Sequence, residues 1–126
     1  MIVQNDFAAP EELTLWDVAR VDFPFAEQPV WRRRPGLIIA NPRLGKSFNL
    51  VWLVMITSAR HEPWPGDVPI SDLQSAGLSR PSYIRTAKVT TLDTRLTSRI
   101  GHLARQDQSE VMRCLRQALA PLLTPT

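Results

Sequence analysis

Two short segments rich in β-branched residues constrain the fold of this chain most. Residues 36–40, Gly-Leu-Ile-Ile-Ala, follow Pro35 and predict a central strand that is buried on both faces. Residues 48–56 combine aromatic and β-branched side chains and predict a second strand. The longest apolar run, residues 50–56, is far too short to cross a bilayer as a helix. A globular β domain is therefore expected rather than a membrane protein.

Weaker patterns predict four further strands. Imperfect alternation of apolar and polar residues predicts a strand over residues 17–23, which Pro24 ends. Residues 68–70 predict a short edge strand because prolines and a glycine surround them. Residues 82–92 are rich in threonine and predict a longer strand, and residues 99–103 predict a last small one. Strands therefore dominate the expected fold.

Two helical segments are expected as well. Residues 71–77 predict a short helical turn, which starts at a Ser-Asp pair suited to capping and closes at a glycine. Asp107 and Glu110 match a capping box, so a C-terminal helix is expected to begin there and to end at Pro121. The apolar face of that helix consists of Val111, Leu115, Ala118, Leu119 and Leu122. The expected fold class is mainly β with α: an antiparallel β-barrel or sheet with a short middle helix and a packed C-terminal helix.

The composition indicates one globular domain. The chain has 126 residues, of which 44% are hydrophobic and 21% are charged. Residues 1–15 lack periodicity and predict an N-terminal extension, which leaves residues 16–126 as the domain. The single cysteine, Cys114, excludes an internal disulfide and a multi-cysteine metal site, and no signal peptide is expected. A cytoplasmic protein is therefore expected, and its net charge of +3 is compatible with a polyanionic partner.

Three consecutive arginines, Arg32, Arg33 and Arg34, stand at the entrance of the central strand. They end an expected loop over residues 25–34, which has the length of loops that carry function on small β folds. Guanidinium groups stay charged at physiological pH, and their planar forks match phosphate oxygens. The arginines are therefore a candidate anion site. The same pattern is also typical of a solvated charge run ahead of a core strand, and the arginines alone leave both interpretations open.

Seven short motifs follow one another in a characteristic order. They are residues 17–22, 33–39, 54–58, 77–82, 91–93, 95–96 and 100–101. The longer ones read Asp-Val-Ala-Arg-Val-Asp, Arg-Arg-Pro-Gly-Leu-Ile-Ile, Val-Met-Ile-Thr-Ser and Gly-Leu-Ser-Arg-Pro-Ser. No single motif is specific, but the collinear set over residues 16–120 resembles the PemK/MazF-like toxins of bacterial toxin-antitoxin systems.

The resemblance implies a fold, an activity and partners. The implied fold is an SH3-like barrel of the CcdB/PemK type with a C-terminal helix, usually found as a homodimer. The implied activity is that of an endoribonuclease that cuts single-stranded messenger RNA at short sequences without a metal or other cofactor. The implied partner is an acidic antitoxin whose disordered tail lies across the RNA-binding groove. Two alternatives remain open: a non-catalytic SH3-like binding module, and a CcdB-like inhibitor of a protein target such as gyrase.

The resemblance also implies catalytic residues. The arginine ahead of the family's proline falls on Arg34, and the threonine that closes its third strand falls on Thr57. Some members use a second arginine two residues before a carboxylate; this arginine falls on Arg85, but the carboxylate position holds Ala87. Cleavage by the neighbouring 2′-hydroxyl also needs groups that accept and donate protons. His61, on a Pro-rich loop, is the main candidate for proton transfer, although a loop histidine is also commonly just solvated. Glu27, in the expected loop before the arginines, is a weaker candidate.

RNA binding is expected from side chains around the arginines. The polar and charged candidates are Arg32, Arg33, Lys46, Arg60 and Ser58. Trp31 and Trp64 suit stacking against bases but are also compatible with closing the ends of the barrel, whereas Trp52 is expected in the core. No metal site is expected, because His61 and His102 are separated and have no cysteine nearby. His102 is expected to pack beside the C-terminal helix.

Overall fold

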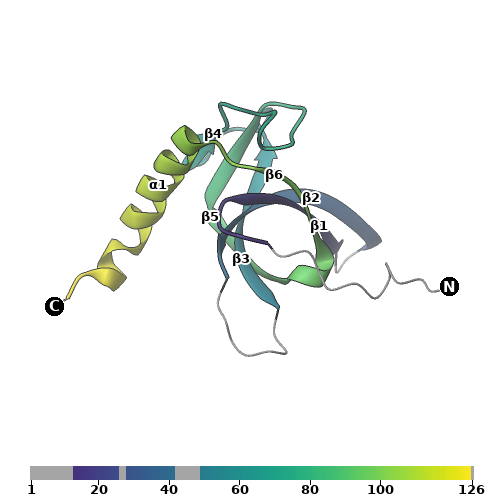
Figure 1. Cartoon of the computed structure of the whole chain (residues 1–126), viewed down its shortest axis with the longest axis horizontal. Coiled ribbons are helices and arrows are strands. Elements are labelled where there is room, and N and C mark those ends of the chain that lie inside the picture. The colour runs from purple at the N-terminus through teal and green to yellow at the C-terminus, as the bar shows by residue number, and fades with distance from the viewer. Residues whose placement is uncertain (1–12, 26–27, 42–48, 126) are drawn as a thin grey trace.

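The computed structural model describes residues 13–25, 28–41 and 49–125, with the backbone alone for residues 22–25 and 28–32. These residues form a mainly antiparallel sheet and one C-terminal helix (Figure 1). The strands are β1 (Asp17–Phe25), β2 (Gln28–Ala40), β3 (Leu50–Ser58), β4 (Asp67–Pro69), β5 (Ser82–Asp93) and β6 (Thr97–His102). A 3₁₀ turn, η2 (Thr94–Leu96), joins β5 to β6, and helix α1 (Arg105–Leu123) follows.

The six strands lie in the order β4-β5-β3-β2-β1-β6, and every neighbouring pair is antiparallel. Strands β4 and β6 are the two edges, and no hydrogen-bonded ladder among the described residues joins them. The sheet is therefore not closed into the barrel that was expected. The physical reason is the shortness of the edge strands, since β4 has 3 residues and ends at Pro69, which has no N–H to donate to a ladder.

Strand β2 begins much earlier than its apolar run. A loop was expected over residues 25–34, but β2 starts at Gln28 and pairs with β1 along most of this stretch. Val21 lies opposite Arg34, and Asp22 lies opposite Arg33. A two-stranded ladder accepts polar and charged side chains wherever a face meets solvent, so the charge run does not interrupt it. The arginines therefore lie within a paired strand rather than in a loop ahead of it.

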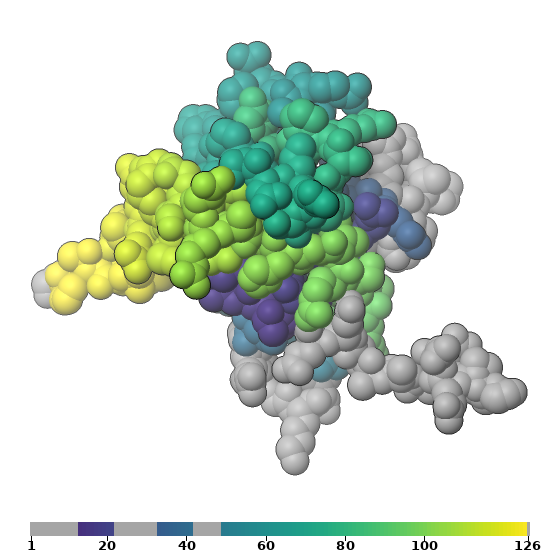
Figure 2. All heavy atoms as spheres, turned by 45° about the horizontal axis from the view of Figure 1, so that its top comes forward, coloured from purple at the N-terminus to yellow at the C-terminus, as the bar shows by residue number. Residues whose placement is uncertain are grey.

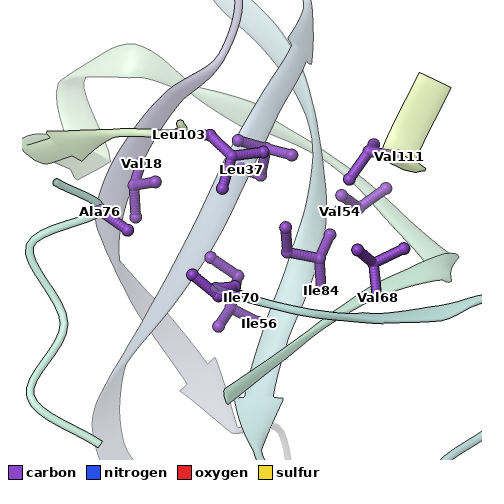
Figure 3. Packing of buried hydrophobic residues seen from close by; sticks show 10 residues of the cluster. All are labelled: Val18, Leu37, Val54, Ile56, Val68, Ile70, Ala76, Ile84, Leu103 and Val111. Carbon is purple, nitrogen blue, oxygen red and sulfur yellow. The ribbon is translucent and has the colours of Figure 1, made fainter. Parts of the chain in front are cut away.

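Strand β2 is buried on both faces, as expected for a central strand. Leu37 belongs to a core cluster that also contains Val54, Ile84 and Val111 (Figure 3). The next residue, Ile38, belongs to a second cluster on the other face. Members of that second cluster are Leu13, Ala19, Val21, Ile38, Val51, Leu53 and Met55. Both side-chain layers along β2 are therefore packed, which holds the strand firmly in the middle of the sheet.

Trp52 is not in the core, contrary to expectation. Its neighbours Val51 and Leu53 are fully buried in the second cluster, but Trp52 is 45% exposed. Because side chains alternate along a strand, Trp52 shares the face of β3 that carries Val54 and Ile56. Trp52 and Ile56 lie at opposite ends of this row of side chains. The first cluster includes Val54 and Ile56 but does not reach Trp52. The burial predicted from its size and apolar character is therefore wrong.

Helix α1 begins at Arg105 with Ala104 as its N-cap, so the expected capping box is absent. Asp107 is buried inside the first turn, where its Oδ2 accepts a hydrogen bond of 2.9 Å from the Ser71 backbone N–H. The carboxylate thus docks the helix onto another segment instead of capping its own backbone. The helix also continues past Pro121 to Leu123, because a proline in the last turn removes only one hydrogen bond.

Only the first half of α1 packs on the sheet. Val111 is fully buried and lies beside Val54 of β3 in Figure 3, and Leu115 is partly buried. Leu119 and Leu122, predicted to continue the buried face, are exposed, and Leu122 is 78% exposed. The yellow end of the helix accordingly stands out from the body of the molecule (Figure 2). Among the described residues, no helix is both long and apolar enough to span a membrane.

The expected short middle helix is instead a set of hydrogen-bonded turns over residues 71–78. Asp72 accepts hydrogen bonds from the N–H and hydroxyl of Ser75, but the backbone bonds that follow differ in span and build no regular helix. Gly77 has a φ of 74°, and a Cβ there would lie 2.0 Å from the Ile100 carbonyl oxygen. The turns thus pack backbone to backbone against β6, and only glycine fits.

Candidate active site

One groove of about 460 Å³ collects the four residues expected to catalyse. It is lined by Arg34, Met55, Ile56, Thr57, His61, Glu62, Trp64, Arg85 and Lys88. Adjacent strands β2, β3 and β5 supply most of these side chains, and the segment between β3 and β4 supplies the rest. Residues far apart in the sequence meet here because the sheet order places their strands side by side.

Arg34 and Thr57 come from neighbouring strands. Gly36 of β2 is paired with Met55 of β3, and Arg34 and Thr57 lie two positions beyond that pair, one on each strand. Because side chains repeat every second residue, both face the same side of the sheet. Both are partly buried, so their backbones are held by the ladder while their side chains reach the groove. A guanidinium and a hydroxyl are thereby presented together from rigid strands.

Arg85 is held on two sides. Its Nε donates to Asp67 Oδ1 at 3.1 Å, and its Nη2 donates to Asp67 Oδ2 at 2.9 Å. The guanidinium carbon also lies 3.8 Å from the centre of the Trp64 ring, in a cation–π contact. Nη2 makes a further, long hydrogen bond of 3.5 Å to the Glu62 carbonyl oxygen. The bidentate pair and the ring contact fix the guanidinium in one orientation within the groove.

Asp67 is the carboxylate that pairs with Arg85, since position 87 holds alanine. Ala87 is exposed on β5, two residues after Arg85. The partner carboxylate comes instead from the adjacent strand, since Asp67 of β4 lies directly opposite Arg85. The Asp67 side chain is only 2% exposed, and its Oδ2 also accepts the Trp64 backbone N–H at 2.8 Å. Asp67 is therefore occupied in holding Arg85 and is not presented to a substrate.

The segment between β3 and β4 folds over the groove through local hydrogen bonds. The His61 N–H donates to the Ser58 carbonyl at 3.2 Å, and the Asp67 N–H donates to the Trp64 carbonyl at 3.0 Å. His61 and Trp64 are exposed and line the groove. The backbone of this segment is thus braced at both ends while its side chains remain accessible.

Two charged residues of the groove, Glu62 and Lys88, were not predicted from the sequence. Glu62 follows His61 directly and is exposed in the groove, and Lys88 follows Ala87 on β5. The sequence signal that could have predicted Glu62 is its position directly after His61 on the Pro-rich segment. Lys88 gave no usable signal, because alternation from Arg85 does not reveal which face of β5 meets the groove.

A second hollow, of about 530 Å³, lies at the end of β3. It is lined by Ser58, Ala59, Arg60, Arg80 and Pro81. The Ala59 N–H donates to the Pro81 carbonyl at 3.0 Å, which joins the two segments that form it. Arg60 and Arg80 are exposed, so the hollow carries positive charge close to Thr57. Ser58 and Arg60 were expected to bind RNA, whereas Arg80 was not predicted.

The other expected RNA-binding residues are distributed differently. Arg33 is exposed on β2, on the opposite face of the strand from Arg34. Trp31 and Arg32 lie on β2, where their backbones pair with Pro24 and Phe23 of β1. Lys46 lies outside the described residues. Of Arg33 and Arg34, the two arginines of this cluster whose side chains the structure describes, Arg34 lines the groove.

His102 does not pack beside the helix. Its side chain is 56% exposed, and its Nδ1 lies 2.9 Å from Asp17 Oδ1. Asp17 is buried and also accepts hydrogen bonds from Arg99 Nε at 2.9 Å and from the Thr14 N–H at 2.8 Å. Burial by itself would raise the pKa of Asp17, but the hydrogen bonds from Thr14, His102 and Arg99 together lower it. This network lies on β1 and β6, at the other edge of the sheet from the groove.

A metal site was not expected. In the part of the chain that the structure describes, no three His, Cys, Asp or Glu side chains lie close enough together to hold a metal ion.

Several solved structures share this fold. A Mycobacterium tuberculosis toxin, MazF-mt6, aligns with a TM-score of 0.63 and 17% identity over 82% of this chain and 96% of its own. MazF in a MazE-MazF structure from Deinococcus radiodurans aligns with a TM-score of 0.66 and 19% identity, over 84% and 94% of the two chains. An endoribonuclease from Mycobacterial species, in complex with its cognate antitoxin, aligns with a TM-score of 0.65 and 19% identity, over 90% and 100%.

Sequence comparison places the chain in a family. A comparison with curated protein sequences found no match. The family model for the PemK-like, MazF-like toxin of type II toxin-antitoxin systems, in contrast, matches residues 15–119. The match covers the whole sheet and most of α1, including every residue that lines the groove. The chain therefore belongs to the PemK-like, MazF-like toxins of type II toxin-antitoxin systems.

Proposed function

We propose that this toxin is a metal-independent endoribonuclease that cleaves single-stranded messenger RNA in the cytoplasm. The observation that carries the proposal is the convergence of Arg34, Thr57, Arg85 and His61 on one groove. Family membership and the endoribonucleases among the similar structures support the same reaction. Cleavage of RNA by its own 2′-hydroxyl needs no metal when cationic side chains stabilise the charge that develops on the phosphate.

The groove residues take separate roles in this reaction. Arg34 is the clamp for the scissile phosphate, because a guanidinium can bind two phosphate oxygens at once. Thr57 donates a hydrogen bond to a phosphate oxygen and fixes its position. Arg85, already paired with Asp67, adds a fixed positive field rather than a second clamp. His61 serves proton transfer, since imidazole is the side chain that most often acts as an acid or base in catalysis.

The second hollow is proposed to hold the RNA backbone next to the cleaved position. Arg60 and Arg80 provide charge for a neighbouring phosphate, and the Ser58 hydroxyl provides a polar contact. Ser58 and Thr57 are adjacent in sequence, so one strand end borders both hollows. Trp64 offers an exposed ring for a base, although its stacking on Arg85 already occupies part of one face.

The proposed partners follow from the family. A cognate antitoxin with an acidic, disordered tail would cover the positive groove and exclude RNA from it. MazE accompanies MazF in the similar structures from Deinococcus radiodurans, and a cognate antitoxin accompanies an endoribonuclease from Mycobacterial species. A homodimer is proposed as the functional form of this toxin.

A cleavage assay tests the proposal. The purified toxin is incubated in EDTA with a long single-stranded RNA of mixed sequence, and cut sites are mapped by primer extension. Specific cuts are expected, and Arg34→Ala is expected to reduce the cleavage rate by on the order of 100-fold or more. Arg33→Ala is the matched control, because Arg33 is the neighbouring arginine on the other face of β2. Its rate is expected to fall by less than about tenfold, through weaker RNA binding.

The same assay separates the alternatives. Growth arrest on expression without any RNA cleavage would contradict the nuclease and favour a CcdB-like inhibitor of a protein such as gyrase. The alanine at position 87 favours such a non-catalytic protein, because it removes a carboxylate that could act as a base. The convergence of Arg34, Thr57, Arg85 and His61 on one groove favours the nuclease instead.

A further inference from the structure

We propose that Glu62 is the general base that removes the proton from the 2′-hydroxyl, which assigns the His61 imidazole the role of general acid. The proposal rests on the proposed ribonuclease function. Arg34 and Arg85 can stabilise charge, but an arginine stays protonated and cannot accept a proton in this reaction. The groove therefore needs a separate acceptor, and Glu62 lines it together with both arginines.

Among the described residues that line the groove, Glu62 is the one carboxylate. Asp67 lies close by, but its side chain is buried and its two oxygens receive hydrogen bonds from Arg85 and from the Trp64 backbone. Position 87, which could carry an acid on β5, holds alanine. Burial and pairing thus remove Asp67 from proton transfer, which leaves Glu62 as the candidate among the carboxylates that the structure describes in the groove.

Glu62 is both anchored and available. Its backbone carbonyl accepts a long hydrogen bond of 3.5 Å from Arg85 Nη2, which places this point of the segment beside the fixed guanidinium. Its side chain is exposed, and no hydrogen bond or ion pair engages the carboxylate within the described parts of the chain. Arg34, Arg85 and Lys88 line the same groove as this carboxylate. An unpaired carboxylate beside fixed cations is suited to approach a hydroxyl next to a bound phosphate.

In the proposed step, phosphorus exchanges its bond to the 5′-oxygen for a bond to the 2′-oxygen. The Glu62 carboxylate takes the proton of the 2′-hydroxyl while the 2′-oxygen forms a bond to phosphorus. The bond from phosphorus to the 5′-oxygen breaks, and the departing oxygen takes a proton from the His61 imidazolium. The products are a 2′,3′-cyclic phosphate and a 5′-hydroxyl, and water returns the proton from Glu62 to His61. His61 and Glu62 are adjacent in the chain, so one short segment supplies both the donor and the acceptor.

Two substrates that differ in the leaving atom distinguish these roles. The first is a short RNA that spans a mapped cut site, and the second carries sulfur in place of the departing 5′-oxygen. Sulfur leaves without protonation, so it bypasses the need for an acid but not for a base. Glu62→Gln is expected to slow single-turnover cleavage of both substrates by about 100-fold. His61→Gln is expected to slow cleavage of the oxygen substrate alone.

Binding and charge controls complete the experiment. Affinity for the same RNA with a 2′-deoxy nucleotide at the cut site is expected to stay within about threefold in Glu62→Gln, because a base acts on the rate and not on binding. Glu110→Gln is the matched control, since Glu110 is an exposed glutamate on α1 and is paired with Arg113 away from the groove. It is expected to cleave like the wild type.

Each outcome bears on one proposal. Cleavage by Glu62→Gln within about threefold of the wild-type rate would overturn the role of Glu62, as would recovery of this variant on the sulfur substrate. If the wild type cleaves, Arg34→Ala does not and Glu62→Gln does, the ribonuclease stands and only the base assignment fails. If the wild type does not cleave RNA at all, the proposed function fails and the role of Glu62 fails with it.

Discussion

Arg85 donates two parallel hydrogen bonds to Asp67, from Nε to Oδ1 at 3.1 Å and from Nη2 to Oδ2 at 2.9 Å. The two residues lie opposite one another on β5 and β4, and both side chains are buried. The carboxylate that pairs with Arg85 is thus on the neighbouring strand β4, and not at position 87 of the same strand. The groove keeps an oriented guanidinium even though position 87 is alanine.

This ion pair predicts strong coupling between the two residues. Arg85→Ala alone leaves a buried carboxylate without its partner and is expected to lower the free energy of unfolding by about 3 kcal/mol. Asp67→Ala alone is expected to cost a similar amount. The double variant is expected to cost about 1–3 kcal/mol less than the sum, because it leaves no buried charge unpaired. Urea denaturation of the four proteins measures this cycle, and additive losses would contradict the pairing.

The pair also predicts a kinetic effect that stability alone would not give. Asp67→Asn keeps the shape of the side chain but removes the charge that orients the Arg85 guanidinium. Its kcat is expected to fall by about tenfold with KM nearly unchanged, because an oriented cation matters most where charge develops in the transition state. Steady-state cleavage at a temperature where the variant is fully folded tests this. Unchanged kcat would show that Asp67 serves stability only.

The helix predicts a sharp boundary between buried and exposed positions. Val111→Asp places an unpaired charge in the core and is expected to lower the free energy of unfolding by more than about 3 kcal/mol. Leu122→Asp is the matched control on the same helix and is expected to change it by less than about 0.5 kcal/mol, because that side chain already meets solvent. Thermal and urea unfolding measure both. Strong destabilisation by Leu122→Asp would show that this half of the helix is covered in solution.

The contact between the turns at residues 71–78 and β6 predicts intolerance at Gly77. Gly77→Ala would place a methyl group against the Ile100 carbonyl at a positive φ, so a loss of at least about 2 kcal/mol is expected. The nearby exposed Ser79→Ala is expected to be neutral. The free energy of unfolding from urea denaturation decides the matter, and equal stability of the two variants would refute the close approach of the backbones.

The lowered pKa of Asp17 predicts how the free energy of unfolding depends on pH. Its pKa in the folded protein lies below 3.8, the value of an unperturbed aspartate, because the hydrogen bonds it accepts outweigh burial. A lowered pKa contributes stability that is fully present above the unfolded value and is lost as the pH falls through the folded value. Asp17→Asn is therefore expected to cost about 2 kcal/mol at pH 7, a difference that shrinks below about pH 4. Urea titrations between pH 3 and pH 7 measure it, and a constant difference would contradict the assignment.

The sequence by itself determined the fold class and the family, and it predicted residues that share one groove. Alternation and β-branched content are local properties, so they located the strands and the fully buried run of β2. The order of short motifs identified the family and, through it, predicted Arg34, Thr57 and Arg85, which line one groove. These features depend on residues that are close together in the chain.

Tertiary structure decided what depends on strand order and packing. The open sheet, the extension of β2 through the arginines and the exposed end of α1 all follow from which segments pair or pack, and periodicity carries no such information. The same holds for the site: Asp67 reaches Arg85 only because β4 pairs with β5, and Glu62 enters the groove only because its segment folds over β3. Contacts between distant residues arise when the sheet assembles, so local sequence patterns could not reveal them.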